Sequence, residues 1–227
     1  MDKLPNQKSR TAMACDHLRE LVIQATFAPG EKLRIDQLVK KLEVSSGAVR
    51  EALSRLTAEG LVVAEPQKGF VVAPISRSDL QDLTNVRVEI EGRCLADSIQ
   101  NGDIDWEGRV LSIQHRLRSL AGSLGNDDLE VTKRWHVLHK QFHDELASAC
   151  TSKWWMQLRS QLYVQSERYR RLSGPVNEFE RDIEAEHDAI ANAAIARDVD
   201  ESVKQMTHHL ESTTRILLNS EIQFLTE

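Results

Sequence analysis

The stretch SSGAVREALSRLTAEGLV, residues 45–62, contains the start, the buried face and the end of one short helix. Ser45 is a good N-cap, because its hydroxyl can accept a hydrogen bond from an N–H group of the first turn. Apolar residues then recur at three- and four-residue spacing, and Gly60 ends the pattern. The apolar stripe consists of Val49, Leu53 and Leu56. The sequence therefore predicts a compact amphipathic helix that packs through one face.

The neighbouring segments place this helix in a larger module. Apolar residues between Arg10 and Phe27 recur at helical spacing until a Pro-Gly pair at 29 and 30, and a shorter helical pattern covers residues 35–42. After Gly60 the period changes to two short β-branched runs, LVVAE and GFVVA, separated by PQKG, which predict a two-stranded hairpin. Three helices and a hairpin are the order of a winged helix-turn-helix, which we expect in residues 1–75.

In such a module the helix after the tight turn lies in the major groove of DNA, and the hairpin tip approaches the backbone or the minor groove. The candidates for DNA binding are then the small residues at the N-terminus of the helix, the residues on its polar face and those at the tip of the wing. These residues are Ser45, Ser46, Gly47, Arg50, Arg55, Lys68 and Gly69. On an isolated helix, such Arg and Lys residues would usually be interpreted as solvent-exposed charges without a binding role. The complete order of helices and hairpin favours DNA binding instead.

Composition limits the class of protein. The 227 residues are 41% hydrophobic, which is ordinary for a globular chain, and neither a membrane-length apolar run nor a signal peptide is visible, so we expect a cytoplasmic protein. The net charge of -6 argues against indiscriminate nucleic-acid binding. Residues 1–75 carry 11 Lys and Arg against 9 Asp and Glu, however, so the mildly basic part is the predicted winged helix. The three widely spaced cysteines suggest buried thiols and no thiolate metal site.

Residues 76–227 predict an all-α bundle of six to seven helices. The first begins after ISRSDL (75–80) with Ser78 as its expected N-cap, and breaks at NGD, GSLGNDD, SGP and RDVDES separate the others. Further helices are predicted at about 104–123, 127–150, 152–172, 177–196 and 198–222. The fold class is therefore mainly α, with a winged helix-turn-helix followed by the bundle.

The motifs PGEKL, IDQLVKKLEVS, VREALSRL and EGLV resemble the GntR family of bacterial transcription factors, and the bundle resembles the FCD effector domain of the FadR-type branch. The resemblance implies a homodimer that binds double-stranded operator DNA through Arg50 and the wing around Gly69. Ser46, Gly47 and Ala48 stand where the family usually has Arg, Thr and Pro, and Asp36 stands at a frequent arginine. These differences imply an operator other than the common half-site, because donors in the groove set base preference.

Histidines in the bundle suggest a metal site. In HVLHKQFHDEL, His139 and His143 are four residues apart and share a helix face, while EHDAI and MTHHL supply His187 and His209 on later helices. Facing helices of a bundle commonly build metal sites, and neutral imidazoles suit zinc or nickel. The alternative is a set of satisfied core or surface histidines. We expect His136 and His208 to be exposed or to lie behind the ligands.

The family resemblance sharpens this hypothesis. Many FCD domains have a metal site made from an aspartate and three histidines, and here His143, His187 and His209 fall on the histidine positions while His139 replaces the aspartate. The resemblance also implies that Arg87 faces the same cavity and binds the carboxylate of a small organic mono- or dicarboxylic acid by a bidentate pair. Alternatively, Arg87 forms an ion pair with Glu91 one turn away. Trp135 could line the pocket, although core packing is the simpler interpretation.

Three functions remain open at this stage. The leading one is a ligand-responsive transcription regulator, which is not an enzyme and whose operator affinity changes when the acid binds near the metal. A metalloenzyme is the second, although the chain has no HExxH, GxSxG, P-loop or dinucleotide motif. A metal sensor, whose effector is the ion itself, would use the same histidines.

Overall fold

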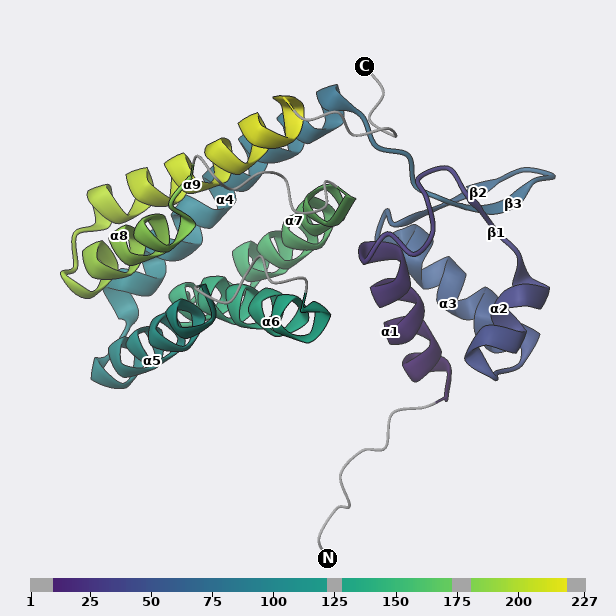
Figure 1. Cartoon of the computed structure of the whole chain (residues 1–227), viewed down its shortest axis with the longest axis horizontal. Coiled ribbons are helices and arrows are strands. Elements are labelled where there is room, and N and C mark those ends of the chain that lie inside the picture. Colours follow the sequence, from purple (N-terminus) through teal and green to yellow (C-terminus); the bar gives the residue numbers. More distant parts are fainter. Residues whose placement is uncertain (1–9, 122–127, 173–180, 220–227) are drawn as a thin grey trace, which may run out of the picture. The chain divides into compact units, whose positions relative to one another are not determined.

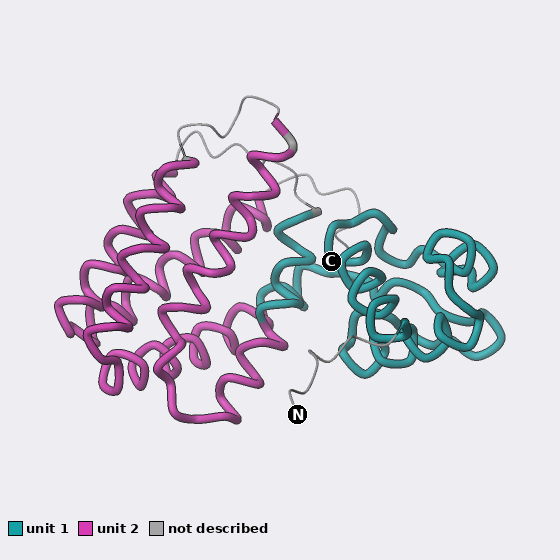
Figure 2. The backbone as a smooth tube through the Cα atoms, turned by 90° about the horizontal axis from the view of Figure 1, so that it is seen from below, with its two compact units in different colours: residues 1–81, 163–174, 220–227 teal, residues 82–162, 175–219 magenta. Residues whose placement is uncertain are grey.

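A computed structural model describes residues 10–121, 128–172 and 181–219. They form two compact units, which Figure 2 shows in teal and magenta. The first unit contains residues 10–81 and the end of a later helix, from residue 163 on, and the second contains most of the remaining helices. Among the described helices, none is long and apolar enough to cross a membrane.

The first unit contains the predicted three helices and a small sheet (Figure 1). Its elements are α1 (Arg10–Ile23), β1 (Lys32–Leu33), α2 (Ile35–Leu42), α3 (Ser46–Ala58), β2 (Val62–Glu65) and β3 (Gly69–Val72). The sheet is antiparallel with strand order β1-β3-β2, so the expected two-stranded hairpin has a third strand. The third strand forms because the Pro-Gly turn brings Glu31 beside Val72, whose N–H donates to the Glu31 carbonyl over 2.9 Å.

Helix α3 begins where the sequence predicts. The hydroxyl of Ser45 accepts a hydrogen bond from the N–H of Ala48 over 3.2 Å, which confirms Ser45 as the N-cap. Val49, Leu53 and Leu56 are completely buried, and they pack with Leu18 of α1 and other residues of this unit's core. Helix α1, in contrast, ends earlier than predicted, because Ala25 has a left-handed backbone with φ of 55°.

The second unit is a bundle of long helices. These helices are α4 (Arg77–Asn101), α5 (Ile104–Ala121), α6 (Leu129–Leu146), α7 (Lys153–Leu172), α8 (Ile183–Ile195) and α9 (Val199–Asn219). The first turn of α4 and the last turns of α7 belong to the first unit. Helix α5 packs against α6 and α8, and α8 packs against α9. Helix α9 also lies along α4, where the hydroxyls of Thr84 and Thr214 form a buried hydrogen bond of 2.7 Å (Figure 1).

Several predicted helix ends shift. The expected N-cap Ser78 is wrong, because α4 starts at Arg77 and it is the Ser76 hydroxyl that accepts from the N–H of Asp79 over 3.0 Å. Helix α6 ends at Leu146 and not at residue 150. The predicted helical residues 122, 123, 127, 177–180 and 220–222 lie outside the described residues. Cys15 and Cys94 are buried as expected, whereas Cys150 is partly exposed because it follows the end of α6.

Candidate functional sites

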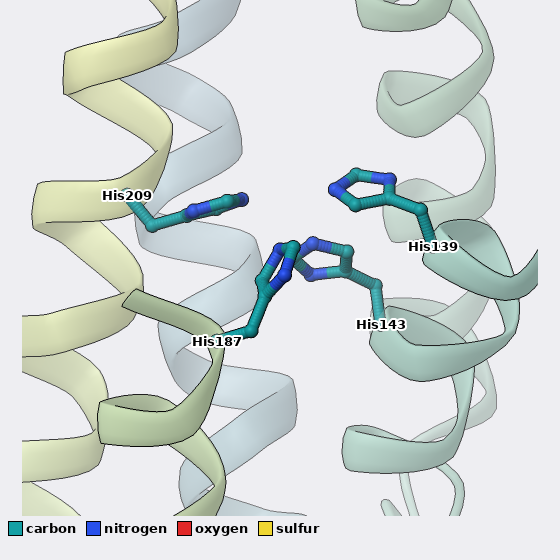
Figure 3. A group of neighbouring side chains, drawn as sticks. All are labelled: His139, His143, His187 and His209. Atoms are coloured by element: carbon teal, nitrogen blue, oxygen red, sulfur yellow. The ribbon is translucent and has the colours of Figure 1, made fainter. Parts of the chain in front are cut away.

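Four histidines from three helices meet inside the second unit (Figure 3). His139 and His143 come from α6, His187 from α8 and His209 from α9, and the four rings point toward one another. Each ring has one nitrogen that could bind a metal ion, and these four nitrogens all lie within 4.8 Å of one another. The structure therefore brings together the four residues that the sequence selected.

The local sequence explains why these rings point inward. On α6 the buried positions Trp135, Leu138, Phe142 and Leu146 repeat at three- and four-residue spacing, so His139 and His143 beside them also face the core. Asp128 is the N-cap of α6, and its carboxylate accepts from the N–H groups of Glu130 and Val131. Asp182 is the N-cap of α8, and its carboxylate accepts from the N–H of Ala185. On α8 and α9, His187 and His209 likewise lie on the faces that carry the buried apolar residues.

The distances within the cluster suit one ion. The ring centres of His139 and His143 are 4.7 Å apart, and those of His187 and His209 are 4.8 Å apart. Two nitrogens bound to a single zinc ion are at most about 4.2 Å apart, twice the usual bond length. In a tetrahedral shell the nitrogens are about 3.4 Å apart, so the four rings would move closer together when they bind one ion.

The cluster is buried, and burial favours the neutral imidazole that binds a divalent metal. The four side chains are 1–6% exposed. Burial lowers the pKa of His143 well below its ordinary value, and neighbouring groups that include Arg87 and Arg159 add to this effect. Burial also lowers the pKa of His209. Neither ring nitrogen of His143 has a hydrogen-bond partner among the described residues, which is costly for a buried imidazole, and a metal bound to one of the two nitrogens would relieve part of this cost.

Other predicted residues of this region take separate places. Trp135 is 6% exposed and belongs to the core, and its ring also stacks on His139 with the ring centres 4.8 Å apart. It therefore packs in the core and covers one ligand candidate. His208 is exposed and His136 is partly exposed, so neither joins the cluster.

Buried charges adjoin the histidines. Arg87 of α4 is 9% exposed, and its guanidinium lies 3.4 Å from the carboxylate of Glu91, the ion pair that was the alternative to ligand binding. Glu91 also accepts from Nε of Arg159 over 2.7 Å. Arg159 then donates to Asp144 and, over 2.6 Å, to the backbone carbonyl of His143. These contacts hold the cluster's α6 residues against α4 and α7.

Sequence reasoning did not select Arg159, Arg181 or Glu186. Arg159 sits among polar residues of α7, and only the folded chain shows that its side chain is 3% exposed. Arg181 and Glu186 contact His209 from 28 and 23 residues away along the chain. The only available signal was the position of Glu186, directly before His187.

The candidate DNA-binding residues lie on the surface of the first unit. Ser45, Ser46, Gly47 and Arg50 are exposed at the start of α3, and the side chain of Arg50 has no hydrogen-bond or ion-pair partner in the described part of the chain. Gly69 lies at the wing tip with φ of 91° and open space around it, a left-handed backbone that glycine adopts without strain.

The two other candidate cations are paired with carboxylates. Arg55 lies 2.6 Å from Glu51 on the same helix, and Lys68 lies 2.8 Å from Glu65 near the tip of the wing. Both pairs are well exposed, and exposed pairs contribute little energy, so they can open when a phosphate approaches.

Comparisons with known proteins agree with this architecture. Residues 10–72 match the gntR family of bacterial regulatory proteins, and residues 82–212 match the FCD domain. The HTH-type transcriptional regulator BphR of Paraburkholderia xenovorans is 37% identical over 214 residues, which cover 94% of this chain and 87% of BphR. The HTH-type transcriptional repressor GlaR of Escherichia coli is 32% identical over 197 residues, which cover 85% of this chain and 89% of GlaR.

The solved structure of Escherichia coli McbR/YncC has the same fold. It superposes with a TM-score of 0.78 over 93% of this chain and 98% of its own, at 19% sequence identity. The relatives are transcription regulators and not enzymes, in agreement with the leading hypothesis from the sequence. The chain therefore belongs to the GntR family of bacterial transcription regulators, with an FCD domain after its winged helix-turn-helix.

Proposed function

We propose that the FCD domain of this regulator binds one divalent metal ion, zinc or nickel, through His139, His143, His187 and His209, and that a small organic acid bound there changes operator affinity. The observation that carries the proposal is the set of four buried imidazoles with nitrogens within 4.8 Å. Four neutral nitrogen donors and no carboxylate favour zinc or nickel over manganese.

Arg87 supplies the second contact for the acid. When bound, the metal would act as a Lewis acid that accepts one carboxylate oxygen. The Arg87 guanidinium is buried beside the cluster, and its 3.4 Å contact with Glu91 is longer than a strong charged hydrogen bond. A ligand carboxylate with better geometry would compete with Glu91 for this guanidinium. An acid with two carboxylates fits the pair formed by the metal and Arg87.

A metal sensor is the second candidate, and the donor set itself favours it. Four histidines can fill the tetrahedral shell of zinc and leave no open position, as in structural sites. The ion would then be the effector. Nickel, with two further positions in an octahedral shell, would keep room for an acid.

The winged helix would bind operator DNA through Ser45, Ser46, Gly47, Arg50, Arg55, Lys68 and Gly69. Exposed small residues at the start of α3 allow a close approach to the groove, and Arg50 has its guanidinium free for a base edge or a phosphate. We place the domain boundary between residues 75 and 76, and we expect a homodimer, because winged helices of this kind read two half-sites.

The test is fluorescence anisotropy with DNA from upstream of the protein's own gene, using metal-free protein, metal-loaded protein, and metal-loaded protein with a panel of mono- and dicarboxylic acids. We expect salt-sensitive, sequence-selective binding. One acid should change the affinity of metal-loaded wild type at least about tenfold, a coupling within the usual range. His143→Ala and Arg87→Ala should remove the response.

The controls separate the two candidates. A change of affinity on adding metal alone, with no further effect of any acid, would select the metal sensor. A response to acid that persists in both variants would contradict the proposed site, and a lack of selective DNA binding would contradict the proposed regulator.

A further inference from the structure

One histidine of the cluster forms a hydrogen bond with a carboxylate. Nδ1 of His209 lies 2.8 Å from Oε2 of Glu186, which is the residue directly before His187 on α8. Glu186 is in turn held by Arg181, whose Nε donates to Oε1 over 2.6 Å and whose Nη2 donates to Oε2. Arg181 also donates to the backbone carbonyl of His209 over 2.8 Å and to the Thr213 hydroxyl over 2.9 Å.

These contacts fix which nitrogen of His209 carries the proton. Nη2 of Arg181 lies 3.2 Å from Nδ1 of His209, but its two hydrogens already serve Glu186 and the His209 carbonyl. Nδ1 therefore has a carboxylate oxygen as its partner, and a carboxylate can only accept. Nδ1 carries the hydrogen, so the lone pair of the neutral ring is on Nε2. The ring itself points at the other three histidines (Figure 3).

The carboxylate of Glu186 is surrounded by donors. Nδ1–H of His209 donates to Oε2, and the Arg181 guanidinium donates to both oxygens, so the charge of Arg181 balances that of the carboxylate. Side chains of Glu186 and Arg181 are only 15% and 10% exposed, so water screens the contact weakly. An ionised acceptor on Nδ1–H makes Nε2 a stronger donor to a metal and holds the ring plane.

We infer that Glu186 is a positioning residue for the metal site and that Arg181 holds Glu186 in place. This inference rests on the proposed metal site. Glu186 orients His209, fixes its tautomer and raises the basicity of Nε2. Arg181 closes the arrangement by binding both oxygens of Glu186 and the backbone of His209. Glu186 would thus be the hydrogen-bond partner of a metal ligand and not a ligand itself.

The experiment compares Glu186→Gln, Glu186→Ala and Arg181→Ala with wild type in the full-length protein. The matched control is Glu184→Ala, because Glu184 lies on the same helix and pairs with Arg118 over 2.7 Å. Zinc affinity is measured by competition with a chelator, and cobalt is added separately to record the d–d absorption spectrum of its complex. Thermal unfolding of the metal-free proteins shows whether each variant folds.

Glu186→Ala is expected to weaken zinc binding by about 10- to 100-fold, the usual effect of losing such a partner, and to change the cobalt spectrum. Glu186→Gln keeps an acceptor for Nδ1–H and should restore part of the affinity, which a merely structural role would not predict. Arg181→Ala should fall between them, and Glu184→Ala should match wild type.

Two results would overturn the inference. One of them would leave the proposed metal site intact, and the other would contradict that site as well. If wild type binds cobalt and His143→Ala does not, while both Glu186 variants keep wild-type affinity and spectrum, then the positioning role is wrong and the metal site stands. If wild type itself binds neither zinc nor cobalt, the proposed function fails together with the inference.

Discussion

Ser45 is a single residue on which both the fold and the proposed function depend. Its hydroxyl caps α3, the helix that carries Arg50. Ser45→Ala should lower the free energy of unfolding by about 1 kcal/mol, since an N-cap hydrogen bond is lost. Urea unfolding followed by circular dichroism measures this change. Ser54→Ala, at an exposed position inside the same helix, is the control, and its effect should stay within about 0.5 kcal/mol. Equal effects of the two substitutions would contradict the capping role.

Asp97 gives a prediction about pH. Its carboxylate accepts from the N–H of Thr151 over 2.6 Å and from the Thr151 hydroxyl over 3.0 Å, which lowers the pKa of Asp97 below its ordinary value of 3.8. A carboxyl with a lowered pKa in the folded state stabilises the fold above pH 3.8, and this contribution is lost as the pH falls further. Wild type should therefore be more stable than Asp97→Asn at pH 6, with the difference shrinking below pH 3.8 in urea unfolding. A difference that stays constant down to pH 3 would contradict this account.

The residues of the histidine cluster show what one sequence can and cannot reveal. His139 and His143 were found because four-residue spacing places two rings on one helix face, a purely local property. Glu186 and Arg159 were not found, because their contacts with His209 and with the His143 carbonyl join residues 23 and 16 positions apart, on different helices. Only the packing of α6, α7, α8 and α9 creates these contacts.

Helix α7 is the element whose role the sequence concealed. Its last turns belong to the first unit, where Gln165 donates to the Glu59 carbonyl at the end of α3 over 2.6 Å. Arg168 donates to the carbonyl of Ala73, just after β3, over 2.5 Å. Tyr169 hydrogen-bonds Asp79 in the first turn of α4. Helical periodicity predicted α7 correctly as a helix but carries no information about partners some 90 to 106 residues away.

Tyr169→Phe tests this contact. Tyr169 is 1% exposed, and its hydroxyl donates to Asp79 and accepts from the Ser76 N–H over 3.4 Å. Removing the hydroxyl should lower the free energy of unfolding by about 1–3 kcal/mol, because polar groups lose a buried partner. Gln161→Ala, at an exposed position on the same helix, should change it by less than about 0.5 kcal/mol in the same urea titration. If Tyr169→Phe is as stable as Gln161→Ala, the contact does not stabilise the first unit.

The strands illustrate the same limit at the level of elements. The β-branched runs of β2 and β3 can be recognised in the sequence, and the structure confirms both predicted strands. Strand β1 has only two residues, too few for any period, and it exists because a turn brings it beside β3.

For the whole molecule, order along the chain proved more informative than bulk charge. Helix, helix, helix and wing, followed by long helices, predicted a winged helix-turn-helix and an all-α bundle, which the comparisons identify as the GntR and FCD regions. The net charge of -6 alone would have argued against a DNA-binding protein. The mildly basic winged helix and the acidic remainder resolve this conflict, because in the proposed complex DNA would contact only the part that carries the exposed Arg50.

The central claim is that four histidines of one chain hold one metal ion, and native mass spectrometry of the intact protein tests it most directly. Wild type and His143→Ala would be loaded with equimolar zinc or nickel, desalted and measured under mild conditions. We predict a dimer with one metal ion per chain for wild type and a dimer that has lost the metal for His143→Ala. Metal-free wild type, or equal metal content in the two proteins, would contradict the account.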